Sequence, residues 1–216
     1  MTRPAVAILA RAPASGGKTR LAPHFPASRL LDLRRALLVD TITVVRAVDA
    51  TPFVFFTPDD GRAEIAAMAP GFALVPQRGA DLGSRMQHAL AHLLDERGFA
   101  SAVLVGSDAP LLTEGDLVSA VASLRNQPVV IGPAEDGGYY LIGMRGLHAA
   151  LFDAVPWGSS AVLQTTLARA KRLAIDTHLL RHVYDIDTIE DLCRVEQDLI
   201  ALPRDVAPNL RAWFKR

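Results

Sequence analysis

The stretch Ser101-Ala-Val-Leu-Val-Gly-Ser-Asp-Ala-Pro-Leu-Leu112 decides the fold of this chain. Its apolar run from Ala102 to Val105 predicts a short buried strand, and Asp108 follows that strand closely. Open α/β sheets carry their chemistry just past the carboxyl ends of their strands, so we expect Asp108 at such an end, in a loop that Pro110 stiffens. A carboxylate there suits a hard cation such as Mg²⁺. The alternative is that Asp108 only caps the helix after it.

Outward from this stretch, predicted strands and helices alternate. Apolar runs predict buried strands at residues 5–10, 52–57, 72–75, 128–132, 139–142 and 182–184. Periodic stretches predict helices between them, and the longest covers residues 27–48. This alternation is typical of an α/β domain with a mostly parallel sheet. We expect one such domain over residues 1–202 and a C-terminal tail over residues 203–216.

The loop after the first predicted strand, Arg11 to Leu21, is basic and contains glycines. Small residues and glycines let backbone N–H groups approach an anion closely, while Lys18 and Arg20 supply positive charge. This composition predicts a phosphate-binding loop, and the alternative is a surface loop whose basic residues are merely solvated.

The same loop is not a P-loop, although Gly17-Lys-Thr19 matches the end of that motif. The motif requires a glycine five positions before Gly17, where this chain has Ala12. It also requires a helix directly after the threonine, and Pro23 and Pro26 would break one. A Walker-type ATPase is therefore disfavoured.

The third predicted strand leads into a segment that suits nucleotide binding. Gln77 carries both a donor and an acceptor, as reading a nucleobase edge requires, and Gly83 would let the backbone lie close to a ligand. The helix that follows is amphipathic, with Leu82 and Met86 on its apolar face. Arg85 falls in the first turn, where the helix dipole disfavours a cation unless an anion is near; a solvated arginine is the alternative.

Between two later strands, Asp136-Gly-Gly138 predicts a tight turn. Asp-Gly is a strong hairpin signal, so turn chemistry alone explains the glycines. Turn chemistry does not explain the acidic pair Glu135-Asp136 beside Tyr139 and Tyr140. Aromatic side chains near carboxylates also suit the binding of a sugar or another polyol. Trp157, in the next loop, either walls a pocket or fills the core.

Two further acids, Asp185 and Asp187, precede the last long helix. On an extended segment both side chains point to one face, where they repel unless a cation lies between them. Thr188, with an aspartate three residues later, predicts the cap of that helix. Cys193 within the helix is expected to be a small buried side chain.

Composition limits the remaining function classes. The chain has 216 residues, half of them apolar, which is compatible with one domain and a sizeable core. Its 23 Lys and Arg balance 23 Asp and Glu, so we expect no nucleic-acid or membrane partner. The first apolar run is too short for a signal peptide or a membrane span, and one cysteine allows no internal disulfide; both favour the cytoplasm. The tail packs either on the domain or on the partner in a homodimer.

Five segments in this order resemble the nucleotide-diphospho-sugar transferase superfamily, which has a GT-A-like fold. More narrowly, the chain resembles a bacterial family whose members are described as glycosyltransferases. That family is related to the phospholactate and molybdopterin guanylyltransferases. The segments are Arg11–Pro13 with Gly17–Leu21, Asp81–Met86, Gly106–Pro110, Gly132–Gly143 and Asp185–Thr188. The resemblance covers residues 5 to about 192 and implies a three-layer α/β sandwich with a mostly parallel central sheet.

The resemblance also implies roles for single residues. Asp108 matches the acid that binds the metal, Mg²⁺ or Mn²⁺, and Asp187 with Asp185 matches a second acidic position. The predicted nucleotide-binding residues are Arg11, Gly17, Lys18, Arg20, Gln77, Gly83 and Arg85. The predicted acceptor-binding residues are Asp136, Gly137, Gly138, Tyr139 and Trp157. The segment 135–140 departs from the guanylyltransferases, which favours a different acceptor.

These observations predict a Mg²⁺-dependent transferase that moves a sugar from a nucleotide-sugar to a small-molecule acceptor. The predicted catalytic residues are Asp108, Lys18 and Asp136: the first holds metal, the second takes up phosphate charge, and the third orients or deprotonates an acceptor hydroxyl. The alternative is a guanylyltransferase-like nucleotidyltransferase that releases pyrophosphate from a nucleoside triphosphate. A nucleotide-binding module without catalysis is the third class.

Overall fold

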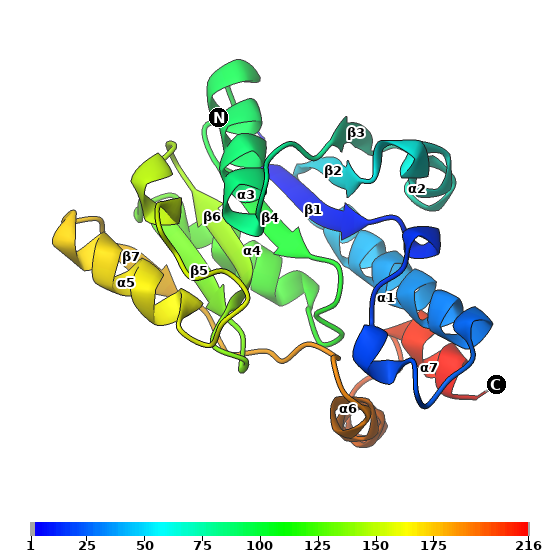
Figure 1. Cartoon of the computed structure of the whole chain (residues 1–216). Coiled ribbons are helices and arrows are strands. Elements are labelled where there is room, and N and C mark those ends of the chain that lie inside the picture. The colour runs from blue at the N-terminus through cyan, green and yellow to red at the C-terminus, as the bar shows by residue number, and fades with distance from the viewer. Residues whose placement is uncertain (1–2, 216) are drawn as a thin grey trace.

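The computed structural model describes residues 3–215 and contains one seven-stranded sheet through the middle of the molecule (Figure 1). The strand order is β3-β2-β1-β4-β6-β5-β7. The strands are β1 (Ala5–Arg11), β2 (Thr51–Thr57), β3 (Ala73–Pro76), β4 (Ala102–Gly106), β5 (Val129–Pro133), β6 (Tyr139–Met144) and β7 (Thr177–Leu179). Neighbouring strands are parallel except where β6 pairs antiparallel with β4 and β5, so the predicted mostly parallel sheet and the 128–142 hairpin are confirmed.

Helices cover both faces of this sheet, because successive side chains of each strand point to opposite faces. Along β1, Val6 and Ile8 pack toward one group of helices, while Ala5 and Ala7 pack toward the other. The first group is α1 (Ala27–Ala47), α2 (Arg62–Met68) and α4 (Glu114–Ser123). The second group is α3 (Leu82–Ala91) and α5 (Val162–Arg172). The predicted three-layer α/β sandwich is therefore confirmed.

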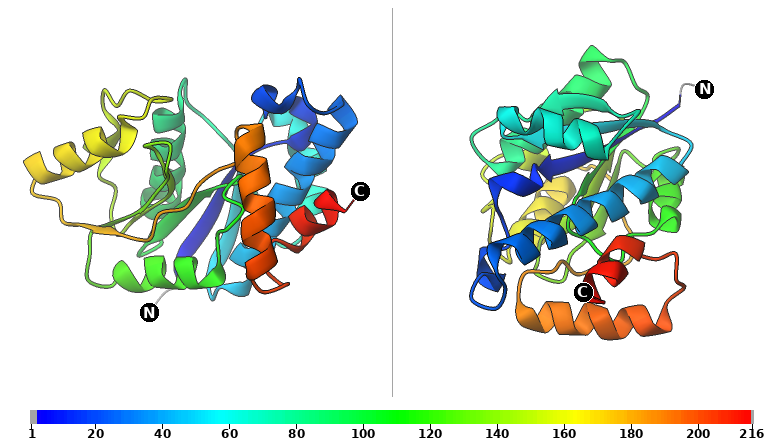
Figure 2. Two further views of the ribbon diagram at one scale, coloured as in Figure 1. Left: turned by 90° about the horizontal axis from the view of Figure 1, so that it is seen from below. Right: turned by 90° about the vertical axis from the view of Figure 1, so that its right-hand side faces the viewer.

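Two more helices, α6 (Ile189–Ala201) and α7 (Pro208–Phe214), lie beside α1 (Figures 1 and 2). The tail therefore packs on its own domain, the first of the two predicted alternatives. Trp213 donates its indole N–H to the Arg29 carbonyl at 3.0 Å, and the Arg29 guanidinium lies 3.9 Å from the centroid of the indole ring. The buried Asp40 carboxylate accepts the first backbone N–H groups of α7, which fixes that helix on α1.

The order of the strands places a crevice between β1 and β4. From β1 the chain builds outward to β2 and β3, whereas β4 begins the other half of the sheet on the opposite side of β1. Ligands of open α/β sheets bind at such a switch point, outside the carboxyl ends of the strands. The register pairs Leu9 with Gly106, so the loops after β1 and after β4 leave the sheet side by side.

Three local predictions are wrong. Residues 182–184 do not form a strand: β7 lies earlier, and Val183 makes an isolated bridge to Ala134 as the chain leaves the sheet for α6. Leu82 is 51% exposed, because it begins α3 beyond the buried stripe of that helix. Cys193 is exposed, because Leu192, Val195 and Leu199 form the buried face of α6. Among residues 3–215, no helix combines the length and the apolar character needed to cross a bilayer.

Candidate active site

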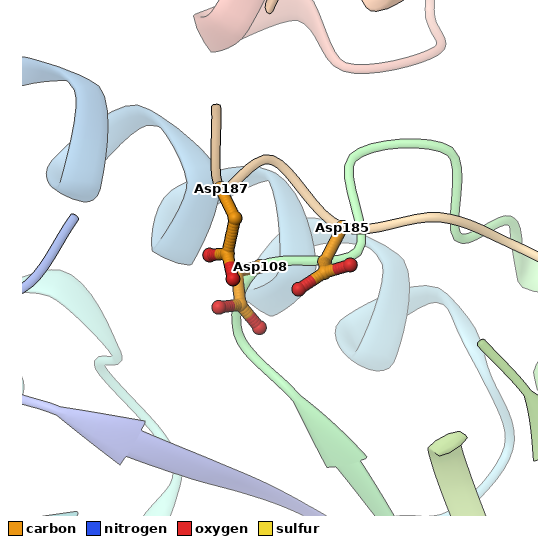
Figure 3. A group of neighbouring side chains, drawn as sticks. All are labelled: Asp108, Asp185 and Asp187. Carbon is orange, nitrogen blue, oxygen red and sulfur yellow. The ribbon is translucent and has the colours of Figure 1, made fainter. Parts of the chain in front are cut away.

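Three acids from distant parts of the chain meet at the crevice (Figure 3). Asp108 stands in the loop after β4, while Asp185 and Asp187 stand on the extended segment before α6. One oxygen from each carboxylate lies within 4.8 Å of the others. The strand end and the alternating extended segment singled out these acids, and the resemblance to the nucleotide-diphospho-sugar transferases implied that they share one site.

The capping box of α6 holds the second pair of acids in place. Thr188 caps the helix as predicted: its hydroxyl accepts the Asp191 backbone N–H, and the Asp191 carboxylate accepts the Thr188 N–H at 2.7 Å. The same carboxylate accepts the Asp187 N–H at 3.0 Å. The backbone that carries Asp187 is therefore fixed by the start of a helix rather than free in a loop.

Lys18 reaches from the loop after β1 into the acid cluster. Its Nζ lies 2.9 Å from an Asp108 oxygen and 3.2 Å from an Asp187 oxygen, and its side chain is only 8% exposed. Burial alone would lower the pKa of this ammonium, but the two carboxylates outweigh burial and hold the pKa above its ordinary value. Lys18 also has a left-handed backbone with φ of 57°, which costs energy in a residue with a β-carbon.

The acid cluster fits a divalent cation. Lys18 pairs with Asp108 and Asp187, whereas Asp185 has no cationic partner among residues 3–215. Burial, then the nearby negative charges of Asp187, Asp108 and Asp136, raise the pKa of Asp185 to about 6. Such excess negative charge on an all-oxygen donor set matches what Mg²⁺ or Mn²⁺ prefers.

Two side chains that the sequence did not single out anchor the loop after β1. Arg34 of α1 donates to the carbonyls of Pro13 and Gly17 at 2.8 and 3.0 Å. Glu64 of α2 accepts the Ala14 N–H at 2.9 Å, and the Arg35 guanidinium pairs with the same carboxylate. Arg34 lies inside α1 and Glu64 in the first turn of α2, and no local pattern distinguishes them there from ordinary surface charges.

Two cavities open on either side of Asp108. The first, of about 220 Å³, is named the phosphate cavity after the sequence prediction, and the second, the acceptor cavity, is named in the same way. The phosphate cavity is lined by Arg11, Gly16, Gly17, Lys18, Arg34, Leu37, Leu38, Ser107, Asp108 and Asp187. The acceptor cavity has a volume of about 370 Å³. It is bounded mainly by residues of β4, β6 and α3, by the loops that follow β4 and β5, and by the loop at residues 157–159. Asp108 and Ser107 line both cavities, so the acid cluster stands where the two meet.

The predicted acceptor residues gather around the second cavity. Asp136, Gly138, Tyr139 and Trp157 line it, and Gly137 forms the turn between them with φ of 90°. A β-carbon at Gly137 would lie 2.1 Å from the Ser160 carbonyl oxygen, so this close approach also requires glycine. Of the two alternatives for Trp157, the structure favours the pocket wall.

The segment predicted to read the base is built differently from expectation. Both N–H groups of the Gln77 amide donate to backbone carbonyls, of Ala10 at 3.0 Å and of Phe55 at 2.8 Å. Gly83 packs under the indole of Trp157, where a β-carbon would lie 2.3 Å from the ring. Arg85 donates to the Gly79 carbonyl. None of the three lines the phosphate or the acceptor cavity as residues 3–215 define them, so their contacts with a nucleotide remain predictions.

Of the remaining predicted nucleotide-binding residues, Arg11, Gly17 and Lys18 line the phosphate cavity. Arg20 stays at its edge, 72% exposed, with its guanidinium 3.4 Å from Asp187. The basic loop, the acids and the cavities therefore form one continuous site at the switch point of the sheet.

This fold and site define a protein of the nucleotide-diphospho-sugar transferase class. A protein from Desulfovibrio desulfuricans G20 that is assigned to that class superposes with a TM-score of 0.92 at 28% identity, over 100% of this chain and 95% of that one. The chain belongs to the family described as "Uncharacterized protein conserved in bacteria (DUF2064)", whose model matches residues 39–159.

Two curated relatives are named for nucleotidyl transfer. The chain is 30% identical over 145 residues to a 3-phospho-D-glycerate guanylyltransferase of Phenylobacterium zucineum, a match over 65% of this chain and 66% of that protein. It is 32% identical over 114 residues to a phosphoenolpyruvate guanylyltransferase of Mycolicibacterium vanbaalenii, over 51% and 54%. The chain thus spans less than two thirds of either relative. Their names favour the alternative prediction, nucleotidyl transfer, over the leading one, glycosyl transfer.

Proposed function

We propose that this protein transfers a nucleotidyl group from a nucleoside triphosphate to a small-molecule acceptor and releases pyrophosphate. The observation that carries the proposal is the position of Asp108, which lines both a basic cavity and an aromatic one. Guanosine triphosphate is the nucleotide we expect, because the two curated relatives are named guanylyltransferases.

In this proposal the phosphate cavity holds the triphosphate. The backbone around Gly16 and Gly17 approaches the phosphate oxygens, and Lys18 and Arg11 supply positive charge to them. Arg34 and Glu64 keep the loop in the shape that allows this approach. Because the loop is already anchored, little conformational entropy is lost in ordering it when the nucleotide binds.

Asp108, Asp185 and Asp187 would hold a divalent ion. When bound, such an ion offsets negative charge on the phosphates of the nucleotide. Lys18 is the residue that balances two of these acids without the ion, so it is the group whose partners change when the site is loaded.

The acceptor occupies the second cavity with its reactive oxygen toward Asp108. That oxygen forms a bond to the α-phosphorus, the bond from the α-phosphorus to the oxygen bridging to the β-phosphorus breaks, and pyrophosphate leaves. Asp136 is the base we propose for the acceptor proton. Its Oδ1 accepts the Gly138 N–H at 2.8 Å, and among residues 3–215 its Oδ2 has no hydrogen-bond partner.

Product analysis tests the proposal. The protein is incubated with Mg²⁺ and either guanosine triphosphate or a guanosine diphosphate sugar, together with a mixture of small hydroxyl compounds. Nucleotidyl transfer predicts acceptor-dependent pyrophosphate from the first donor. Release of nucleoside diphosphate from the second donor alone would instead support glycosyl transfer, and binding of nucleotide without either product would support a binding module.

A further inference from the structure

The acceptor cavity contains no positive charge. Among the residues that line it, all within the described range 3–215, there is no lysine, arginine or histidine. Its ionisable groups are Asp108, Asp136 and Asp185, besides two tyrosines. The phosphate cavity on the other side of Asp108 differs sharply, because Arg11, Lys18 and Arg34 line it.

Apolar and aromatic groups form most of the acceptor cavity wall. Trp157 lies in an edge-to-face arrangement with Tyr139, with 6.2 Å between ring centroids, and stacks on Phe152 at 6.3 Å. The buried Met86 and the half-exposed Leu82 also line this cavity. The polar side-chain groups besides the acids are the hydroxyls of Ser107 and Ser159, because the Tyr139 hydroxyl is buried and the Tyr140 hydroxyl donates to the Arg181 carbonyl.

We infer that the acceptor is an uncharged, hydroxyl-bearing molecule with an apolar face, of the sugar or polyol class, and not a phosphorylated acid. The inference rests on the proposed function for the statement that the bound molecule is the acceptor of the transfer. Its chemical class follows from the charge and the wall of the cavity. It separates this chain from its relatives named for 3-phospho-D-glycerate and phosphoenolpyruvate.

The electrostatic argument holds with a loaded site as well. A divalent ion would neutralise part of the acid cluster, but a nucleoside triphosphate brings more negative charge than that ion removes. Asp136 then still faces the acceptor cavity without a cationic partner among residues 3–215. A phosphate or carboxylate group on the acceptor would lose its water shell beside like charges, and no arginine or lysine there would replace that water.

The same groups suit an uncharged polyol. The free Oδ2 of Asp136 can accept a hydroxyl hydrogen, and the parts of Trp157 and Tyr139 that line the cavity can pack against C–H groups of a sugar ring. The volume of about 370 Å³ lies in the range of sites that enclose one small molecule. The predicted departure of segment 135–140 from the guanylyltransferases falls in this wall.

Matched pairs of ligands test the inference by binding alone. The pairs are methyl glucoside with glucose 6-phosphate and glycerol with glycerol 3-phosphate, added to the full chain with Mg²⁺ and a non-hydrolysable guanosine triphosphate analogue. Binding is read from quenching of Trp157 fluorescence, with Trp157→Phe as the control for signal origin. We expect the uncharged member of at least one pair to bind at least tenfold more tightly than its phosphorylated partner. Tighter binding of the phosphorylated members, or no binding by any uncharged member, would overturn the inference.

A positive charge introduced at the exposed part of the cavity lining tests whether charge causes the preference for uncharged ligands. Leu82 is half exposed and lines the cavity, so Leu82→Lys adds a cation without disturbing the core, and Leu82→Gln is the matched neutral variant. The preference for uncharged ligands should shrink at least fivefold in Leu82→Lys and persist in Leu82→Gln. An equal preference in both variants would overturn the electrostatic argument.

Turnover separates this inference from the proposed function. Pyrophosphate release with the uncharged members supports both. If the uncharged members bind at Trp157 but no pyrophosphate appears, the nucleotidyl transfer fails and the ligand class stands. If pyrophosphate appears only with the phosphorylated members, the ligand class fails and the nucleotidyl transfer stands.

Discussion

The two cavities on either side of Asp108 differ in the charge and polarity of the side chains that line them. The phosphate cavity is basic, and Arg34 and Glu64 fix its loop through hydrogen bonds to the backbone. The acceptor cavity is aromatic and acidic, and packing fixes its wall, with Trp157 lying directly on Gly83. The difference teaches that one acid cluster borders two surroundings of opposite charge, and under the proposed function each would take a ligand of different charge.

Removing the shared acid should have the largest effect. We expect Asp108→Asn to lower the rate of pyrophosphate release by about 100-fold or more, because charge stabilisation of the reacting phosphates depends on the cluster. The measurement is a coupled pyrophosphate assay with saturating Mg²⁺. The control is Asp95→Asn. Asp95 is exposed and follows the C-terminal end of α3, whereas the residues of α3 that line the cavity lie in its first half. Activity within twofold of wild type in Asp108→Asn would show that the two cavities do not share this residue functionally.

A change on the phosphate side alone should be the next largest. Lys18→Met should raise the KM for the nucleoside triphosphate by roughly tenfold or more, because a buried charged hydrogen-bond donor is lost. Without divalent ions the variant should also melt at a lower temperature than wild type, because Asp108 and Asp187 lose their partner, and Mg²⁺ should restore more of its stability. Lys171→Met, an exposed lysine at the far end of α5, is the control. A Mg²⁺ effect no larger than in wild type would contradict the shared position of the ammonium and the cation.

A change on the acceptor side alone should be smaller and should spare the nucleotide. Trp157→Ala should raise the KM for the acceptor by about tenfold, because an aromatic wall of the cavity is lost. The affinity for the nucleotide analogue, measured by calorimetry, should stay within twofold. Trp157→Phe should recover most of the acceptor binding. A parallel loss of nucleotide affinity would mean that the two cavities are not separate sites.

An ion pair outside both cavities, between the buried Asp116 and the half-exposed Arg181, should change stability more than activity. Asp116 is 7% exposed and accepts from the Arg181 guanidinium at 2.6 Å, and it closes the capping box of α4. Burial alone would raise the pKa of this carboxyl, but hydrogen bonds from Arg181 and Thr113 hold it below its ordinary value of 3.8. The pair therefore stabilises the fold above that pH, and the contribution is lost as the pH falls through the lowered pKa.

Asp116→Asn should accordingly cost about 1–2 kcal/mol at pH 7, and the difference from wild type should shrink below pH 4. Urea denaturation at both pH values measures this. A difference that stays constant with pH would show that the carboxylate charge contributes nothing.

The sequence predicted most of the fold and the chemical groups of the site. Strand ends and short alternating segments are local patterns, and they were enough to single out Asp108, Asp185 and Asp187 before any contact between them was known. Lys18 followed from the composition of one loop. The capping threonine of α6 could also be predicted, because its partner lies three residues away.

What the sequence could not predict depends on contacts between distant segments. Arg34 and Glu64 are ordinary charged residues of two helices, and only the packing of α1 and α2 shows that they hold the loop after β1. Gln77 has the groups to read a base, but the sheet uses its amide N–H groups. The need for glycine at position 83 arises from Trp157, more than seventy residues later.

Binding of Mn²⁺ tests the central claim most directly, because it needs neither an identified acceptor nor turnover. Calorimetric titration with a non-hydrolysable guanosine triphosphate analogue present would compare wild type, Asp108→Asn, Asp187→Asn and Asp95→Asn. The acid cluster predicts one Mn²⁺ site whose affinity falls at least tenfold in the first two variants and is unchanged in the third. Equal Mn²⁺ affinity in all four proteins would contradict the account.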